Sequence, residues 1–185
     1  GQLTDDRFNE KLKQKKEKPE ALDEIAITNS FGMPTQEQDY VMKDIEEANN
    51  KLKEGQIMVV SVVGTADEGA DFIKDFKRTA AIAKESGAKV IEANFSCPNV
   101  ATGEGSIYNN PNTVKEIAEN LVNEIKDIPL IIKVGYFTDK KNMEKVFIEA
   151  AKAGVRAISG INTIGMEVVD ENNKPALGED RKKSG

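Results

Sequence analysis

The sequence has 185 residues, 38% of them hydrophobic, with 26 Lys and Arg against 32 Asp and Glu, for a formal net charge of -6. This composition excludes a disordered tail and suits one domain with a core, while the acidic balance gives no general attraction for nucleic acid. Histidine is absent, which excludes a histidine zinc site, a Ser-His-Asp triad and a Cys-His pair within these residues.

The first predicted region is a charged N-terminal arm, residues 1–23. Its sequence, "GQLTDDRFNEKLKQKKEKPEALD", is crowded with charge and nearly empty of large apolar side chains. Such a segment buries too little apolar surface to fold alone, so we expect a solvated arm without a role in the core. Residues 24–185 are expected to form the folded region.

Apolar runs that are short and rich in β-branched residues predict strands along this region. A short run, "EIAITNS" (24–30), comes first. The stronger runs follow in this order: "IMVVSVVG" (57–64), "AKVIEANFS" (88–96), "LIIKVG" (130–135) and "RAISGIN" (156–162).

Helical spacing separates these strands. Apolar residues recur at helical intervals over 114–125 and again over 143–151. Gly87 and Gly154 stand where a helix end needs a left-handed residue. Strands alternating with helices predict a parallel sheet covered by helices, which is either doubly wound or part of a (β/α)8 barrel.

Polar residues at the strand ends help to choose between these folds. They follow each strong run at the carboxyl end, where both folds keep their chemistry. Neither GxGxxG nor GxxxxGK[ST], the common nucleotide fingerprints of doubly wound sheets, occurs in the sequence. The sequence therefore favours the barrel.

Five segments carry a resemblance to a known family. They are "EANFSCPNV" (92–100), "NSFGMP" (29–34), "VVSVVG" (59–64), "LIIKVGYFTD" (130–139) and "ISGINTIG" (158–165). Their motifs and order resemble the dihydroorotate dehydrogenases, FMN-dependent enzymes of pyrimidine synthesis built on a (β/α)8 barrel. The resemblance covers residues 24–185, and the SCPN loop is similar to the class that uses a cysteine base.

This resemblance implies a catalytic role for Cys97. In the family the cysteine removes the C5 proton of dihydroorotate while a hydride passes from C6 to the flavin. A thiol has an ordinary pKa near 8.5, so a site that favours thiolate makes it a usable base. Without the resemblance, a lone cysteine is more often an inert buried side chain.

The resemblance also implies a set of polar contacts to the substrate. A carboxamide offers one acceptor and two donors, which suits the alternating groups of a pyrimidine ring. Taken singly, an asparagine at a strand end is more often a turn residue. The implied substrate contacts are Asn29, Asn94, Asn99, Asn162 and Thr163, with Asn94 also touching the flavin. No metal ligand is implied.

Lys133 interrupts the apolar run "PLIIKVGYF". A lysine in a buried strand is costly unless an acceptor or a negative charge lies nearby, which argues for a function. The resemblance implies that it contacts the flavin ring, where a cation stabilises the reduced form. The alternative is a lysine whose tip reaches solvent.

The chain departs from the family pattern at both ends. In the family, two strands and a second lysine precede the segment that "NSFGMP" resembles. Two further strands, which hold the FMN phosphate, follow the segment that "KKSG" resembles. We therefore expect an incomplete barrel of about four strong parallel strands. Its open edges favour either a homo-oligomer that completes the sheet or a sequence that is only part of the working enzyme. We also expect a cytoplasmic protein with no membrane partner, because nothing near the N-terminus resembles a signal or an apolar span.

Two further hypotheses stay open beside the dehydrogenase. One is a half-barrel that binds no flavin and serves as a ligand-binding or association module. The other is a structural α/β domain in which Cys97 and Lys133 share no role; it predicts that replacing Cys97 leaves ligand binding unchanged.

Overall fold

The computed structural model describes residues 12–13, 36–65, 71–96, 107–177 and 183–184. The chain divides into two compact units. One comprises Gly1–Pro34 together with Thr163–Gly185, and the other comprises Thr35–Asn162. The predicted boundary between residues 23 and 24 and the predicted strand at 24–30 lie outside the described residues.

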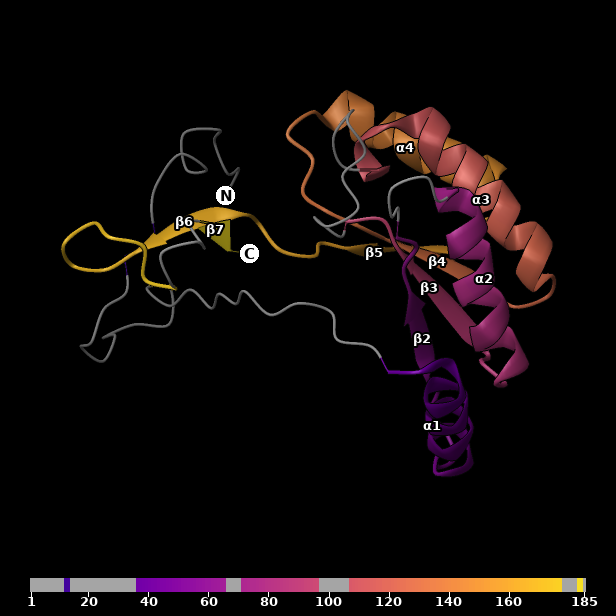
Figure 1. The fold of residues 1–185 in the computed structure, drawn as a ribbon. Helices are drawn as coiled ribbons and strands as arrows, with labels where there is room; N and C mark the ends of the chain where they lie inside the picture. Colours follow the sequence, from indigo (N-terminus) through magenta and orange to yellow (C-terminus); the bar gives the residue numbers. More distant parts are fainter. Residues whose placement is uncertain (1–11, 14–35, 66–70, 97–106, 178–182, 185) are drawn as a thin grey trace. The chain divides into compact units, whose positions relative to one another are not determined.

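Residues 35–162 form a four-stranded parallel sheet with strand order β2-β3-β4-β5. Helices α2, α3 and α4 lie together on one side of it (Figure 1). The elements in chain order are α1 (Gln38–Asn50), β2 (Val59–Val62), α2 (Phe72–Glu85), β3 (Val90–Asn94), the 3-10 helix η4 (Ile107–Asn109), α3 (Pro111–Ile125), β4 (Leu130–Val134), α4 (Lys140–Lys152) and β5 (Ala157–Gly160).

This topology confirms the prediction of an incomplete barrel. The strands follow one another in chain order without a reversal, whereas a doubly wound sheet has a switch point and helices on both faces. The four strong strands appear where they were predicted, and α3 and α4 match the two predicted helical stripes. The described sheet does not close on itself.

The two faces of the sheet differ in burial. In β4 the side chains of Leu130, Ile132 and Val134 are buried, while those of Ile131 and Lys133 between them are only half-buried. Alternation of this kind puts successive residues on opposite faces. The buried set therefore faces the helices, and the face with Ile131 and Lys133, here called the open face, is the one that points to the interior of a barrel.

The core lies between the helices and the sheet. Phe76 packs edge-on against Phe72 and Phe95, with ring centroids 4.9 and 5.6 Å apart. Phe76 and Phe95 are fully buried, and each such side chain stabilises the fold by about 1.5–3 kcal/mol. Gly64 makes room for this packing, because a Cβ there would lie 2.5 Å from the ring of Phe76.

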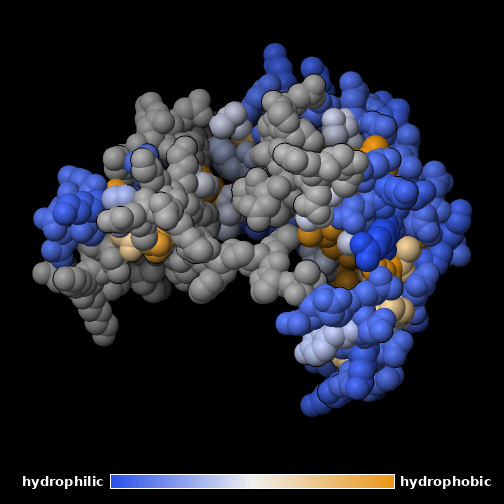
Figure 2. Space-filling model, in the orientation of Figure 1, coloured by the Kyte–Doolittle hydropathy of each residue, from blue (hydrophilic) through white to orange (hydrophobic). Residues whose placement is uncertain are grey.

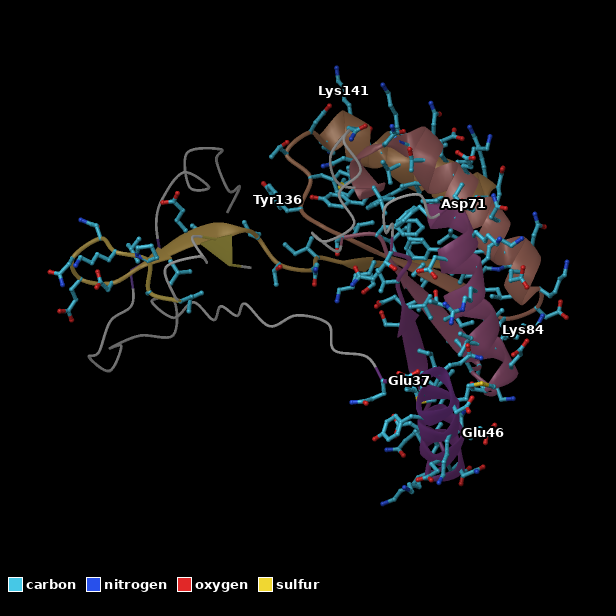
Figure 3. All side chains as sticks on the ribbon, viewed as in Figure 1. Glu37, Glu46, Asp71, Lys84, Tyr136 and Lys141 are labelled. Carbon is cyan, nitrogen blue, oxygen red and sulfur yellow. The ribbon has the colours of Figure 1, made fainter. Side chains whose placement is uncertain are left out.

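Local signals fix the helix ends. Asp71 caps α2 by accepting hydrogen bonds from the backbone N–H groups of Ile73 and Lys74, at the position labelled in Figure 3. Gly87 and Gly154 follow α2 and α4 with φ of 87° and 96°. This confirms the prediction that these glycines occupy left-handed positions at helix ends.

Strands β2 and β5 are the two edges of the described sheet. Strand β2 pairs only with β3 in this sheet, and β5 pairs only with β4. Large apolar side chains are exposed here, including Ile57 just before β2, Val59 in β2 and Ile158 in β5. Figure 2 shows hydrophobic side chains at the surface in the part of the view where Figure 1 places β2. The exposed edges that were predicted for a partial barrel are therefore present.

The other unit contains three short strands that were not predicted: β1 (Leu12–Lys13), β6 (Met166–Val169) and β7 (Lys183–Ser184). Strand β6 pairs in parallel with β1 and antiparallel with β7, and its residues Val168 and Val169 are buried. After β6 the chain turns at Asp170, whose carboxylate accepts hydrogen bonds from the backbone N–H groups of Asn172 and Lys174.

Candidate functional site

The structure describes four of the seven predicted site residues. Asn94 is the last residue of β3, Lys133 lies near the end of β4, and Asn162 follows β5. Thr163 begins the segment that belongs to the other unit. Cys97, Asn29 and Asn99 lie outside the described residues, so their roles stay predictions.

Asn94 and Lys133 are direct partners across the two parallel strands that carry them. The backbone N–H of Phe95 donates to the carbonyl of Lys133 at 3.0 Å, which fixes this register. Because paired residues point to the same side of a sheet, the carboxamide and the ammonium share the open face. Ser159 of β5 pairs with Lys133 on its other side, so a polar row crosses three strands at their carboxyl ends.

The carboxamide of Asn94 is held by a local turn. Its Oδ1 accepts from the backbone N–H of Ser96 at 3.2 Å and from the Ser96 hydroxyl at 3.0 Å. The residue is buried, with 6% of its surface exposed. Asn94 therefore fulfils the ordinary turn role of an asparagine and also stands at the predicted site, with an orientation that is set before any ligand binds.

Asn162 ties the ends of the strands together. Its backbone N–H donates to the carbonyl of Val134 at 3.0 Å, and its Nδ2 lies 3.5 Å from the carbonyl oxygen of Ser96. The segment after β5 thus reaches across β4 to the segment after β3. These contacts bring Asn94, Lys133 and Asn162 to one edge of the sheet, as the sequence predicted.

A contact that the sequence did not reveal braces this edge. The Tyr108 hydroxyl donates to the carbonyl of Tyr136 at 3.0 Å. Tyr136, which is labelled in Figure 3, lies on the segment after β4. The Tyr108 ring also packs edge-on against Phe137, with centroids 5.1 Å apart. Gly135 leaves the space for this ring, since a Cβ there would lie 2.5 Å from its Cζ.

A carboxylate on the open face was also missed. Glu92 precedes Asn94 by two residues in β3 and is half-buried. The hydroxyl of Ser61, its direct partner in β2, donates to Glu92 Oε1 at 2.9 Å. Alternation along the strand was the available signal, because residues 92 and 94 must point to the same side.

The edge combines a half-buried cation with oriented amides. A lysine ammonium here can attract an anionic ring, while the carboxamides can donate and accept hydrogen bonds without adding charge. These properties fit the ring of a flavin and a pyrimidine substrate. Among the described residues, no group of three or more Asp, Glu, Cys or His side chains is placed to hold a metal ion.

Comparison with known proteins agrees with this geometry. A family model described as "Dihydroorotate dehydrogenase" matches residues 14–185. A dihydroorotate dehydrogenase of Dictyostelium discoideum is 52% identical over 170 residues, which cover 90% of this chain and 46% of that protein. The catalytic subunit of a dihydroorotate dehydrogenase B (NAD(+)) of Methanopyrus kandleri is 31% identical over 145 residues, covering 78% of this chain and 42% of that subunit.

The chain belongs to the dihydroorotate dehydrogenase family. It spans less than half the length of either of these relatives. In the part of the chain that the structure describes, no helix is both long and apolar enough to cross a membrane.

Proposed function

We propose that this chain supplies part of an enzyme that oxidises dihydroorotate to orotate with FMN, in pyrimidine synthesis. The observation that carries the proposal is the pairing of Asn94 with Lys133 at the carboxyl ends of adjacent parallel strands. Active sites of barrel enzymes lie at this end of the strands. The family membership of the chain supports the same reaction.

Each residue receives one task in this proposal. Cys97 removes the proton from C5 of the substrate. The carboxamides of Asn29, Asn94, Asn99 and Asn162, with the hydroxyl of Thr163, hold the substrate ring by hydrogen bonds. The turn with Ser96 supports this task for Asn94, since a preset orientation lowers the cost of binding.

Lys133 and Asn94 are the residues that would hold the flavin ring. When bound, FMN supplies the acceptor for the hydride that leaves C6 of the substrate. The Lys133 ammonium offers positive charge beside that ring, and its place on the open face keeps it away from the helix-side core.

We also propose that the open edges of the sheet pair with another polypeptide chain. The partner that we predict is a second copy of this chain. Strand edges with exposed apolar side chains favour pairing with another strand. A cytosolic location stays a prediction. The flavin-free module is not favoured. Of the two relatives described above, one is named a dihydroorotate dehydrogenase and the other the catalytic subunit of such an enzyme.

Anaerobic reduction of FMN by dihydroorotate tests the reaction directly. The purified chain is mixed with FMN and dihydroorotate, and flavin bleaching is followed by absorbance. We expect bleaching that depends on both protein and substrate, with orotate formed in equal amount. Binding of FMN without bleaching by dihydroorotate would contradict the proposed substrate.

A further inference from the structure

Strands β2 to β5 contain two charged residues, Glu92 and Lys133, and the register places both on the open face. Glu92 lies opposite Ile131, and Lys133 lies two residues beyond Ile131 on the same strand. The two charges are therefore diagonal neighbours on adjacent strands. Neighbouring strands lie about 4.8 Å apart and rise about 3.3 Å per residue, so diagonal positions are about 8 Å apart, which long side chains can bridge.

The position of Glu92 is fixed from its other side. Ser61 donates to Oε1 of the carboxylate at 2.9 Å from the neighbouring strand. A carboxylate offers about four acceptor sites on its two oxygens, so the bond to Ser61 leaves capacity for an ammonium donor or its bridging water. The carboxylate is thus held in place and can still act on Lys133.

Covering the open face would strengthen the attraction between Glu92 and Lys133. An unpaired charge that loses water is costly, whereas a charge with an opposite partner is tolerated. Both residues are already half-buried. A ligand or further chain over this face strengthens their attraction because the local dielectric constant falls.

We propose that Glu92 is a positioning residue, the counter-ion that holds the Lys133 ammonium at the carboxyl edge of the sheet. The consequence for the flavin rests on the function proposed above. Glu92 directs the cation toward the ring and offsets part of its charge, so that it tunes how strongly the site favours reduced flavin.

The pairing is tested without flavin by a double-mutant cycle. Glu92→Gln, Lys133→Met and the double variant are unfolded in urea, and the unfolding equilibrium constants are compared. We expect the change in the unfolding equilibrium constant of the double variant to differ about 5-fold from the product of the changes in the two single variants. This difference should be smaller in 1 M NaCl, which screens the charges. Additivity to within about 2-fold would overturn the pairing.

Lys89 provides the matched control. This lysine is exposed just before β3. Combining Lys89→Met with Glu92→Gln is expected to give additive effects, since Lys89 lies outside β3 and is exposed to solvent, which screens its charge.

The midpoint potential of bound FMN separates positioning from mere support of the fold. Glu92→Gln removes negative charge near the ring and should raise the potential, while Lys133→Met should lower it. Lys89→Met keeps Glu92, Ser61 and Lys133 and removes an exposed lysine before β3, so it should leave the potential unchanged. An unchanged potential in Glu92→Gln would overturn the positioning role. Failure of the chain to bind FMN would count against the proposed function, while the cycle still decides the pairing.

Discussion

The ring of Tyr108 occupies the space that a side chain at position 135 would need. A Cβ on Gly135 would lie 2.5 Å from Cζ and 2.7 Å from the hydroxyl oxygen of Tyr108. The same hydroxyl donates to the carbonyl of Tyr136, one residue further on. Glycine at this position therefore lets the segment before α3 close against the end of β4.

Gly135→Ala should lower the free energy of unfolding by about 1–3 kcal/mol, because the added methyl group overpacks a filled space. Urea denaturation of the variant measures the loss. Gly165→Ala is the matched control, since a Cβ there meets nothing within 4 Å. Equal stability of the two variants would show that the Tyr108 ring can move aside.

Acid should weaken the turn after β6. Hydrogen bonds from the backbone N–H of Lys174 and then of Asn172 lower the pKa of Asp170 below its ordinary value of 3.8. A carboxylate with a lower pKa in the folded state stabilises that state above the ordinary value and loses this effect as the pH falls through the folded-state pKa.

Carbon-detected NMR titration of the Asp170 carboxyl checks this direction. We expect a midpoint below 3.8, and loss of the turn signals of Asn172 and Lys174 over the same pH range. Asp170→Asn keeps an acceptor without the charge, so its turn signals should not follow that titration. A midpoint at or above 3.8 in the wild-type chain would contradict the hydrogen bonds seen here.

Cys97→Ala should slow substrate-driven reduction of bound flavin by about 10²-fold or more, the usual scale for losing a general base. Stopped-flow absorbance measures this rate anaerobically. In the unaltered protein, the rate should rise with pH as the thiolate forms. FMN binding serves as the control and should be unchanged in the variant; an unchanged reduction rate would remove Cys97 from the mechanism.

The strands could be predicted because their signals are local. Each run is short and rich in β-branched residues, which is a signal that needs no knowledge of distant contacts. The observed strands are shorter than predicted where pairing ends; Ile57, for example, belongs to a predicted run but is exposed and precedes β2. Helix α1 was not predicted because Ile45 is its one buried residue, which leaves a weak stripe.

The site was predictable to a smaller extent. Asn94 and Lys133 stand out as polar residues near the ends of apolar runs, and sheet register then brings them together. The bond between Asn162 and Ser96 joins residues 66 positions apart, and only the folded chain brings them close. Gly135 gave no signal, since its role is to leave space for a ring from another segment.

Titration of FMN into the purified chain, followed by quenching of flavin fluorescence, tests the central claim that the edge formed by Asn94 and Lys133 binds the cofactor. We predict saturable quenching at micromolar or tighter affinity, weakened about 10-fold or more in Lys133→Met. Lys89→Met, which removes an exposed lysine at the opposite end of the sheet, should bind as the unaltered chain does. No saturable quenching, or equal affinity in Lys133→Met and the unaltered chain, would contradict the claim.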